Sequence, residues 1–241
     1  MKILSLDASG RSVSAALLDG DKVLAEAFED MGLKHSVRLL PMIDGLMNPA
    51  GWHVRDLDMI AAVVGPGSFT GVRISVSTAR GLAQPYDTPC VGINTLEALA
   101  FDAPPFDGIV CPMLDARADQ VYAGAFDARD MSRRFPDGAF SLAEFLEKVK
   151  AKAHETVKET ANELGDTGAF LFTGDASLIH RAAIMDIMGG SYNVKFAAPL
   201  RILPRASAAG MLALAGHTHP VKYTELLPIY LRKPQAERNA E

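Results

Sequence analysis

The nine residues GPGSFTGVR, at positions 65–73, join the apolar run MIAAVV (59–64) to a segment with helical spacing, ISVSTARGLA (74–83). Glycine and proline indicate a tight turn between a strand and a helix, because glycine accepts positive φ and proline fixes its own backbone. Such a loop can also bind phosphate through the free N–H groups of the helix N-terminus. Two interpretations are therefore open: a phosphate site or a structural turn.

Neither common phosphate motif fits this loop. A Walker A loop needs a lysine after its glycines, which this loop lacks, and the dinucleotide fingerprint GxGxxG has a shorter glycine spacing. Ser68 and Thr70 are placed to cap the following helix, and Arg73 could pair with a phosphate or a carboxylate. We keep Gly65, Gly67, Ser68 and Arg73 as candidate anion ligands.

The composition is that of an ordinary globular protein, with 241 residues, 49% hydrophobic and 22% charged. A formal net charge of −5 without a Lys/Arg cluster argues against an autonomous nucleic-acid-binding protein.

The longest uncharged apolar run, 59–64, is far shorter than the roughly 20 residues that span a bilayer. Asp7 interrupts the first apolar run too early for a signal peptide. Cys90 and Cys111 lack CxxC spacing, which favours buried thiols in a reducing compartment, so we predict a cytoplasmic protein.

Apolar spacing and turn residues predict an alternation of strands and helices in the first hundred residues. Asp19-Gly20-Asp21 is typical of a hairpin turn. Ser36 is the expected N-cap of the first helix and Asn48-Pro49 its stop, while Pro41 should kink that helix or delay its start. The predicted elements are strands 2–6, 12–18 and 22–28, helix 36–47, strand 59–64, helix 72–84, strand 90–93, and helix 95–101 capped by Asn94.

The order of elements begins again after a Pro/Gly-rich linker at 102–108. Strands are predicted at 109–114, 120–126 and 169–173, and a helix at 141–164 that opens with the capping box Ser141 and Glu144. Two landmarks repeat at nearly one spacing: strand-ending aspartates 108 residues apart (7 to 115) and strand-ending glycines 109 apart (65 to 174). Such a repeat indicates a duplicated unit.

Two halves of the type β-β-β-α-β-α, each with an aspartate after its first strand, are typical of actin-like and sugar-kinase-like proteins. We therefore predict an α/β, actin-like ATPase (ASKHA) fold of two duplicated RNase H-like halves with mixed sheets. The first half should span 1–103 and carry the partner-binding helices, and the second should span 104–241.

Asp7 and Asp115 occupy the places where actin-like ATPases hold carboxylates that organise Mg²⁺ and the attacking water. The phosphate loop that should follow is only partial at Ala8-Ser9-Gly10-Arg11 and lacks glycine at Ala116-Arg117-Ala118. We list both aspartates as candidate ligand residues but interpret Asp7 as a structural carboxylate. No cofactor is firmly predicted, and any nucleotide binding should be weak.

Several stretches resemble, in order, the TsaB (YeaZ) family. GPGSFTGVR ahead of ARGLA is the most characteristic of them. The resemblance covers essentially the whole chain and is weakest at 130–170 and 178–215. The other matching stretches are ILSLDAS (3–9), HSVRLLPMI (35–43), PCVGINTLEALA (89–100), DARADQVYAGAF (115–126), TGDAS (173–177) and PIYLR (228–232).

The resemblance implies a role in forming N6-threonylcarbamoyladenosine at position 37 of tRNAs that read ANN codons. Proteins of this family pair with the related subunit TsaD, which holds the metal and transfers the threonylcarbamoyl group, and the ATPase TsaE joins that pair. It also implies a cytoplasmic setting, contact with tRNA only through the complex, and a homodimer when TsaD is absent. A peptidase label (M22-like) has accompanied the family through its glycoprotease-like relatives.

The residues favour a partner over a catalyst. Catalytic relatives bind metal through His-x-x-x-His on the first helix, whereas Leu39 stands four residues after His35 here. His217 and His219 fall in a Pro-bounded loop and are interpreted as solvated. We predict no metal ligand and no catalytic residue, and hence a non-catalytic subunit that supports TsaD. An ATP-dependent phosphotransferase of actin-like fold and a metallopeptidase-like protein remain the alternatives.

Helices 36–47 and 72–84 hold more apolar residues than one buried stripe requires, which indicates an interface in addition to a core. By the resemblance, this face meets TsaD; the alternative is burial inside the monomer. The candidate interface residues are Val37, Leu40, Ile43, Met47, Val76 and Ala79.

Overall fold

The computed structural model describes residues 1–32, 34–160, 168–216 and 218–232. Its contacts divide the chain into two compact units, Met1–Ala98 with Leu203–Glu241 and Leu99–Ile202. We call them unit 1 and unit 2. Parts of the predicted helix 141–164 and His217 lie outside the described residues.

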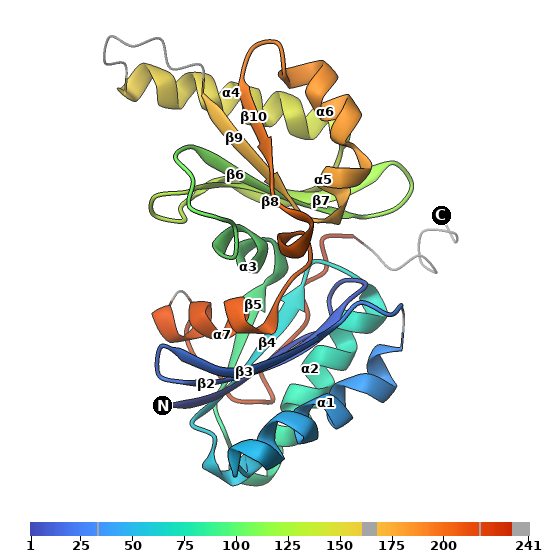
Figure 1. Cartoon of the computed structure of the whole chain (residues 1–241), viewed down its shortest axis with the longest axis vertical. Coiled ribbons are helices and arrows are strands. Elements are labelled where there is room, and N and C mark those ends of the chain that lie inside the picture. The colour runs from blue at the N-terminus through green and yellow to red at the C-terminus, as the bar shows by residue number, and fades with distance from the viewer. Residues whose placement is uncertain (33, 161–167, 217, 233–241) are drawn as a thin grey trace. The chain divides into compact units, whose positions relative to one another are not determined.

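Unit 1 is built on a five-stranded mixed sheet with the order β3-β2-β1-β4-β5. Helices α1 and α2 pack on one face of the sheet and α7 packs on the other (Figure 1). Side chains alternate along β1, so that Leu4 and Leu6 join the core under α1 and α2 while Ile3 joins the core under α7. The elements are β1 (Lys2–Asp7), β2 (Val13–Asp19), β3 (Lys22–Glu29), α1 (His35–Ala50), β4 (Met59–Gly65), α2 (Phe69–Ala83), β5 (Cys90–Asn94) and α7 (Ala206–Ala215), with short 3₁₀ turns at Val54–Asp56 and Gln84–Tyr86. Helix α3 (Thr95–Phe101) spans the boundary between the two units.

Unit 2 repeats this topology with the sheet order β10-β9-β6-β7-β8. Its core joins the sheet to α4 and α6 through side chains such as Phe145 and Ile184. The elements are β6 (Ile109–Asp115), β7 (Gln120–Asp127), β8 (Arg133–Ser141), α4 (Leu142–Thr160), β9 (Ala169–Thr173), α5 (Asp175–Ile179), α6 (Arg181–Met188) and β10 (Asn193–Phe196), followed by a 3₁₀ turn at Pro199–Arg201.

The two sheets confirm the duplication. In each, the first strand of the unit is central, pairs antiparallel with the second strand and parallel with the fourth. Asp7 and Asp115 are the last residues of the equivalent strands β1 and β6. Gly65 lies at the end of β4 and Gly174 directly after the equivalent strand β9, and their φ values are positive, 111° and 90°. This is the α/β fold of two actin-like halves that the sequence predicted.

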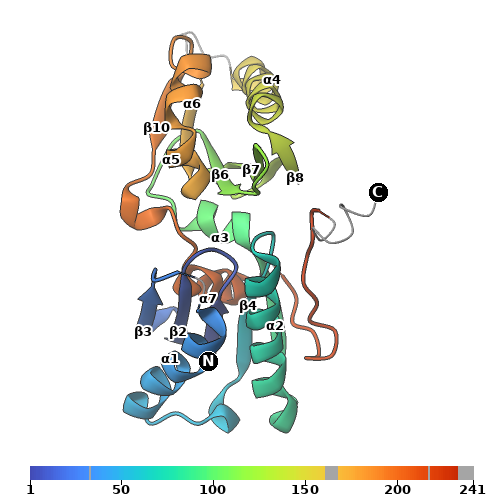
Figure 2. The same ribbon diagram turned by 90° about the vertical axis from the view of Figure 1, so that its right-hand side faces the viewer.

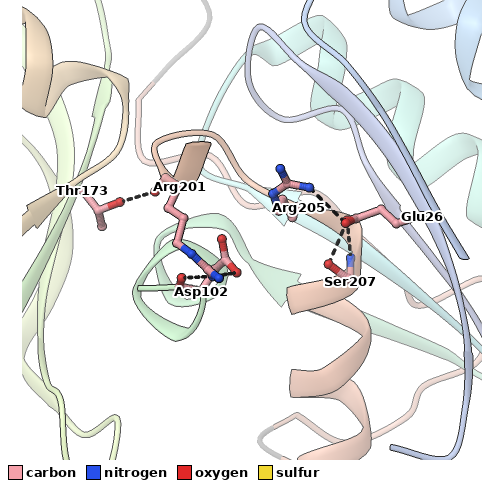
Figure 3. A network of polar contacts seen from close by, with 6 residues as sticks. All are labelled: Glu26, Asp102, Thr173, Arg201, Arg205 and Ser207. Atoms are coloured by element: carbon pink, nitrogen blue, oxygen red, sulfur yellow. Dashed lines mark hydrogen bonds and ion pairs between the residues drawn. The ribbon is translucent and has the colours of Figure 1, made fainter. Parts of the chain in front are cut away.

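The units do not follow the predicted ranges 1–103 and 104–241, because residues from Leu203 onward group with unit 1. Two polar networks on the connecting segment explain where the chain changes unit (Figure 3). In unit 2, Thr173 Oγ1 donates to the Arg201 carbonyl at 2.7 Å, and Arg201 Nη1 donates to Asp102 Oδ1 at 2.7 Å. In unit 1, Glu26 accepts hydrogen bonds from Arg205 Nη1 at 3.1 Å and from the Ser207 amide at 3.0 Å. Arg201 and Arg205 are thus anchored in different units, four positions apart.

The first helix differs at both ends from its prediction. α1 begins at His35, so Ser36 lies inside it and is not its N-cap, and Pro41 does not delay its start. The helix continues through Asn48-Pro49 and ends at Gly51, whose φ of 66° gives the left-handed C-cap that a glycine accepts readily. By contrast, the predicted caps Ser68 and Asn94 accept backbone hydrogen bonds from Gly71 and Leu96.

The 65–73 loop packs directly against the loop that follows β1. A Cβ atom at position 67 would overlap the Ser9 carbonyl oxygen, and one at position 71 would overlap the Ala8 carbonyl oxygen. The Ser68 amide donates to the same Ser9 oxygen at 2.7 Å. Only glycine permits this approach, so Gly67 and Gly71 are packing requirements of the junction between β1 and α2.

We expect Gly71→Ala to destabilise unit 1 by about 1–3 kcal/mol, because the added methyl group must push apart two backbone segments. Gly81→Ala is the matched control in the same helix, since a Cβ there meets nothing within 4 Å. That variant should gain up to about 1 kcal/mol from helix propensity. Urea unfolding of both variants measures the difference, and equal stabilities would contradict the close approach at position 71.

Candidate functional site

The buried carboxyl of Asp7 lies at the carboxyl end of β1, where ligands bind in open α/β sheets. Its Oδ1 accepts a hydrogen bond from the Ser9 amide at 2.9 Å, while Oδ2 is buried without a hydrogen-bond partner among the described residues. Burial raises the pKa of Asp7 above 3.8 and outweighs the effects of Ser9 and of the nearby His35, which lower it. Asp7 is therefore a buried carboxyl that is held by one backbone hydrogen bond.

His35 is held as a core residue. Its ring is buried, and Nε2 lies 3.2 Å from the Arg11 carbonyl oxygen, to which it can only donate. Leu39, four residues later, belongs to the core between α1 and the sheet. Within the described ranges, no group of three or more His, Cys, Asp or Glu side chains could hold a metal ion.

Asp115, the counterpart of Asp7 in unit 2, is exposed. Its Oδ1 accepts a hydrogen bond from the Arg117 amide at 2.8 Å, and its own amide donates to Asp175 Oδ1 at 3.1 Å. Arg117 and Ala118 have left-handed φ values of 59° and 51°, so the chain turns back at once into β7. Asp115 therefore organises a tight turn, and the two repeated aspartates sit in unlike environments.

Some of the candidate anion ligands in the loop already form hydrogen bonds within unit 1. The Ser68 amide donates to Ser9 and its Oγ accepts from the Gly71 amide, so both groups of Ser68 have partners within unit 1. Gly65 has no room for a side chain, because a Cβ there would lie 2.5 Å from the Ile229 carbonyl oxygen. The structural interpretation of the glycines is thus supported at each position, and the phosphate role of Gly65, Gly67 and Ser68 stays a prediction.

Arg73 is the exposed cation of this region. Its guanidinium carbon lies 3.8 Å from the centre of the Phe69 ring, and Nε donates to the Tyr230 hydroxyl at 2.8 Å. The contact with Tyr230 joins residues 157 positions apart in the sequence. Arg73, unlike Ser68 and the buried Asp7, is an exposed candidate ligand.

The six candidate interface residues separate into two groups. Val37 and Leu40 on α1 are exposed, at 63% and 49%. The other four are buried in the core of unit 1, which corrects their assignment to the interface: Ile43, Met47, Val76 and Ala79. The reason is that α1 and α2 pack side by side on one sheet face, so each helix buries a stripe against the sheet and its neighbour.

A family model described as TsaD, tRNA N6-adenosine threonylcarbamoyltransferase, matches residues 29–239. The chain is 34% identical over 239 residues to the tRNA threonylcarbamoyladenosine biosynthesis protein TsaB of Bacillus subtilis, covering 98% of this chain and 96% of that protein. The chain belongs to the TsaB family.

Other members and a solved structure agree with this assignment. TsaB of Escherichia coli is 37% identical over 124 residues, covering 51% of this chain and 53% of that protein. The structure of YeaZ from Pseudomonas aeruginosa superposes with a TM-score of 0.71 at 26% identity, covering 95% of this chain and 99% of that chain. Both the predicted family and the predicted fold are confirmed.

The sequence did not reveal two features of this region. The pairing of Arg73 with Tyr230 had no local signal, although the PIYLR stretch at 228–232 was noted as resembling the family. The core role of His35 was also missed, because a single histidine in a sequence does not indicate whether it is buried.

Among the described residues, no helix is both long and apolar enough to cross a membrane.

Replacing Asp7 by Asn tests its buried state. Because its pKa is raised, the Asp7 carboxyl of the folded chain keeps a proton that the unfolded chain loses near pH 3.8. The free energy of unfolding therefore falls as pH rises through the folded-state pKa of Asp7. We expect the free energy of unfolding of the unmodified chain to fall, relative to that of Asp7→Asn, as pH rises above 3.8. Urea unfolding at a series of pH values measures this difference, and a difference independent of pH would contradict a raised pKa.

Proposed function

We propose that this chain is the non-catalytic partner of a TsaD-like subunit in forming N6-threonylcarbamoyladenosine at position 37 of tRNAs that read ANN codons. One observation carries the proposal: Leu39, four residues after His35, fills the core with an apolar side chain where a second metal-binding imidazole would be needed. The burial of Asp7 supports it, because the fold of unit 1 encloses this carboxyl.

The partner surface that we propose is the exposed side of α1. Val37 and Leu40 project apolar side chains there, and Val37 also lines a groove of about 340 Å³. Exposed apolar side chains next to a groove are typical of protein interfaces, because a partner side chain can fill the groove and exclude water. The groove is lined by Ala27, Glu29, Val37, Arg38, Pro41, Met42, Gly45 and Leu46.

The remaining components follow from the same proposal. A TsaE-like ATPase would join the pair, and a second copy of the chain could occupy the α1 surface when the TsaD-like subunit is absent. The net charge of −5 favours a complex in which the partners supply most of the contacts with tRNA. The setting would be the cytoplasm, where tRNA is modified.

Reconstitution tests the proposal. The purified TsaD-like subunit and TsaE-like ATPase are combined with tRNA and the threonylcarbamoyl-adenylate donor, with and without this chain. The modified nucleoside, measured by mass spectrometry of digested tRNA, should form only when both the chain and the TsaD-like subunit are present. Modification by the chain alone, or full activity without it, would contradict the proposal; metal-dependent proteolysis or ATP turnover by the chain alone would favour the alternatives.

Leu39 and Leu40 provide a matched pair for the partner surface. Leu40→Glu places a charge on the exposed side of α1 and should weaken binding of the TsaD-like subunit by roughly 30-fold or more, with little change in Tm. Leu39→Glu buries an unpaired charge and should unfold unit 1. Circular dichroism melting and titration calorimetry with the partner separate the two effects, and binding of the Leu40→Glu variant at full affinity would exclude this surface.

A further inference from the structure

Three side chains at the start of α2 form a preorganised cationic group. The Arg73 guanidinium lies over the Phe69 ring, Tyr230 accepts the Arg73 Nε hydrogen bond, and the rings of Phe69 and Tyr230 lie 5.0 Å apart. We call these three residues the Arg73 platform. Stacking and a hydrogen bond hold the guanidinium in one orientation, so little side-chain entropy remains to be lost on binding.

The C-terminal segment fixes the platform in place. It runs beside α2 as the red chain in Figure 2. Val221 pairs with Cys90 at the edge of the sheet, Leu226 is buried in the core of unit 1, and the Ile229 amide donates to the Val64 carbonyl at 2.7 Å. These contacts place Tyr230 next to Arg73, so the segment from Val221 to Tyr230 supplies one of the three residues of the platform.

The Arg73 guanidinium has hydrogen-bond donors that the described residues do not use. Within the part of the chain that the structure describes, no carboxylate lies within ion-pair distance of Arg73, and only its Nε donates a hydrogen bond. Helix α2 contains two arginines and no acidic residue, although the whole chain carries a net charge of −5. The N-terminal end of the helix adds a partial positive charge nearby. An anionic group would therefore be attracted to this place on an acidic protein.

Three features favour a protein carboxylate as that group. Arginine and tyrosine are the residues most enriched at interface hot spots, and both are present. Leu227 and Ile229, on the same segment as Tyr230, are exposed apolar residues at 62% and 42%. The guanidinium presents a planar fork that matches a carboxylate in a bidentate pair. An RNA backbone would require further cations, and the acidic balance of the chain does not provide them.

We propose that the Arg73 platform binds an Asp or Glu side chain of the TsaD-like subunit, next to apolar residues that cover Leu227 and Ile229. The inference rests on the proposed function, because it extends the partner surface from α1 to the start of α2. Phe69 and Tyr230 act as positioning residues for the Arg73 guanidinium.

Titration calorimetry of the full-length chain against its purified TsaD-like subunit tests the platform. Arg73→Ala should weaken binding roughly 10- to 100-fold, the range for a lost charge-assisted hydrogen-bonded pair. Arg73→Lys should recover only part of this affinity, because lysine keeps the charge but lacks the planar fork. Tyr230→Phe should cause a smaller loss, since it removes only the hydrogen bond to Nε. Arg55→Ala is the matched control, because Arg55 is exposed and its ion-pair partner is the neighbouring Asp56.

Salt dependence provides a second readout. The affinity of the unmodified chain should fall with added salt more steeply than that of Arg73→Ala, whose ion pair is missing. All variants should melt within a few degrees of the unmodified chain, because the substituted side chains are exposed or half-buried.

Two outcomes would overturn the inference. Equal partner affinity of Arg73→Ala and the unmodified chain would exclude a carboxylate on the platform, while leaving the proposed function intact. Normal partner affinity with weakened tRNA binding by the assembled complex would assign the platform to RNA phosphate instead. If the unmodified chain does not bind the TsaD-like subunit, the proposed function itself fails, and the two failures are thus distinguishable.

Discussion

The close approach of two backbone segments determines how unit 1 is built. The carbonyl groups of Ala8 and Ser9 fill the space that side chains at positions 67 and 71 would occupy, and the Ser9 oxygen accepts the Ser68 amide. This contact fixes the end of β1 against the start of α2. The Ser9 carbonyl also satisfies the amide of Ser68, the N-cap residue of α2.

Closure of that junction has consequences for function. The carboxyl group at the end of β1 becomes fully buried, and burial favours its protonated form. The side chain four residues after His35 packs into the core instead of pointing to a metal. The chain has the duplicated topology of its fold, but the buried residues at this junction serve to pack the core. We infer that its working surfaces lie outside, on the exposed side of α1 and at the start of α2.

Much of the fold could be predicted from the sequence because its signals were local. The hairpin turn at Asp19-Gly20-Asp21, the caps Ser68 and Asn94, and the spacing of Asp7 and Asp115 each depend on a few neighbouring residues. Strand β8 was not delimited, because RRFPDGAFS contains charges, a proline and a glycine that an edge strand tolerates but a strand pattern does not suggest. The end of α1 was also underestimated, because the helix runs past Asn48 and Pro49 to a left-handed C-cap at Gly51.

The candidate site was harder to predict, because its features depend on contacts across long distances in the sequence. Apolar spacing identified α1 and α2 as unusually apolar but could not show that Ile43 and Val76 face the sheet while Leu40 faces outward. The association of residues after 202 with unit 1 could not be predicted either, because it involves Glu26 binding the distant Arg205 and Ser207. Family resemblance supplied the functional class, which packing arguments alone do not contain.

We infer that the end of β1 and the glycine loop form a packing junction that holds no nucleotide. Titration calorimetry of Mg·ATP into the purified chain, without partner proteins, tests it most directly. We expect no saturable heat up to millimolar nucleotide. Saturable binding with a micromolar Kd, lost in the Asp7→Asn variant while its melting temperature stays unchanged, would contradict the account.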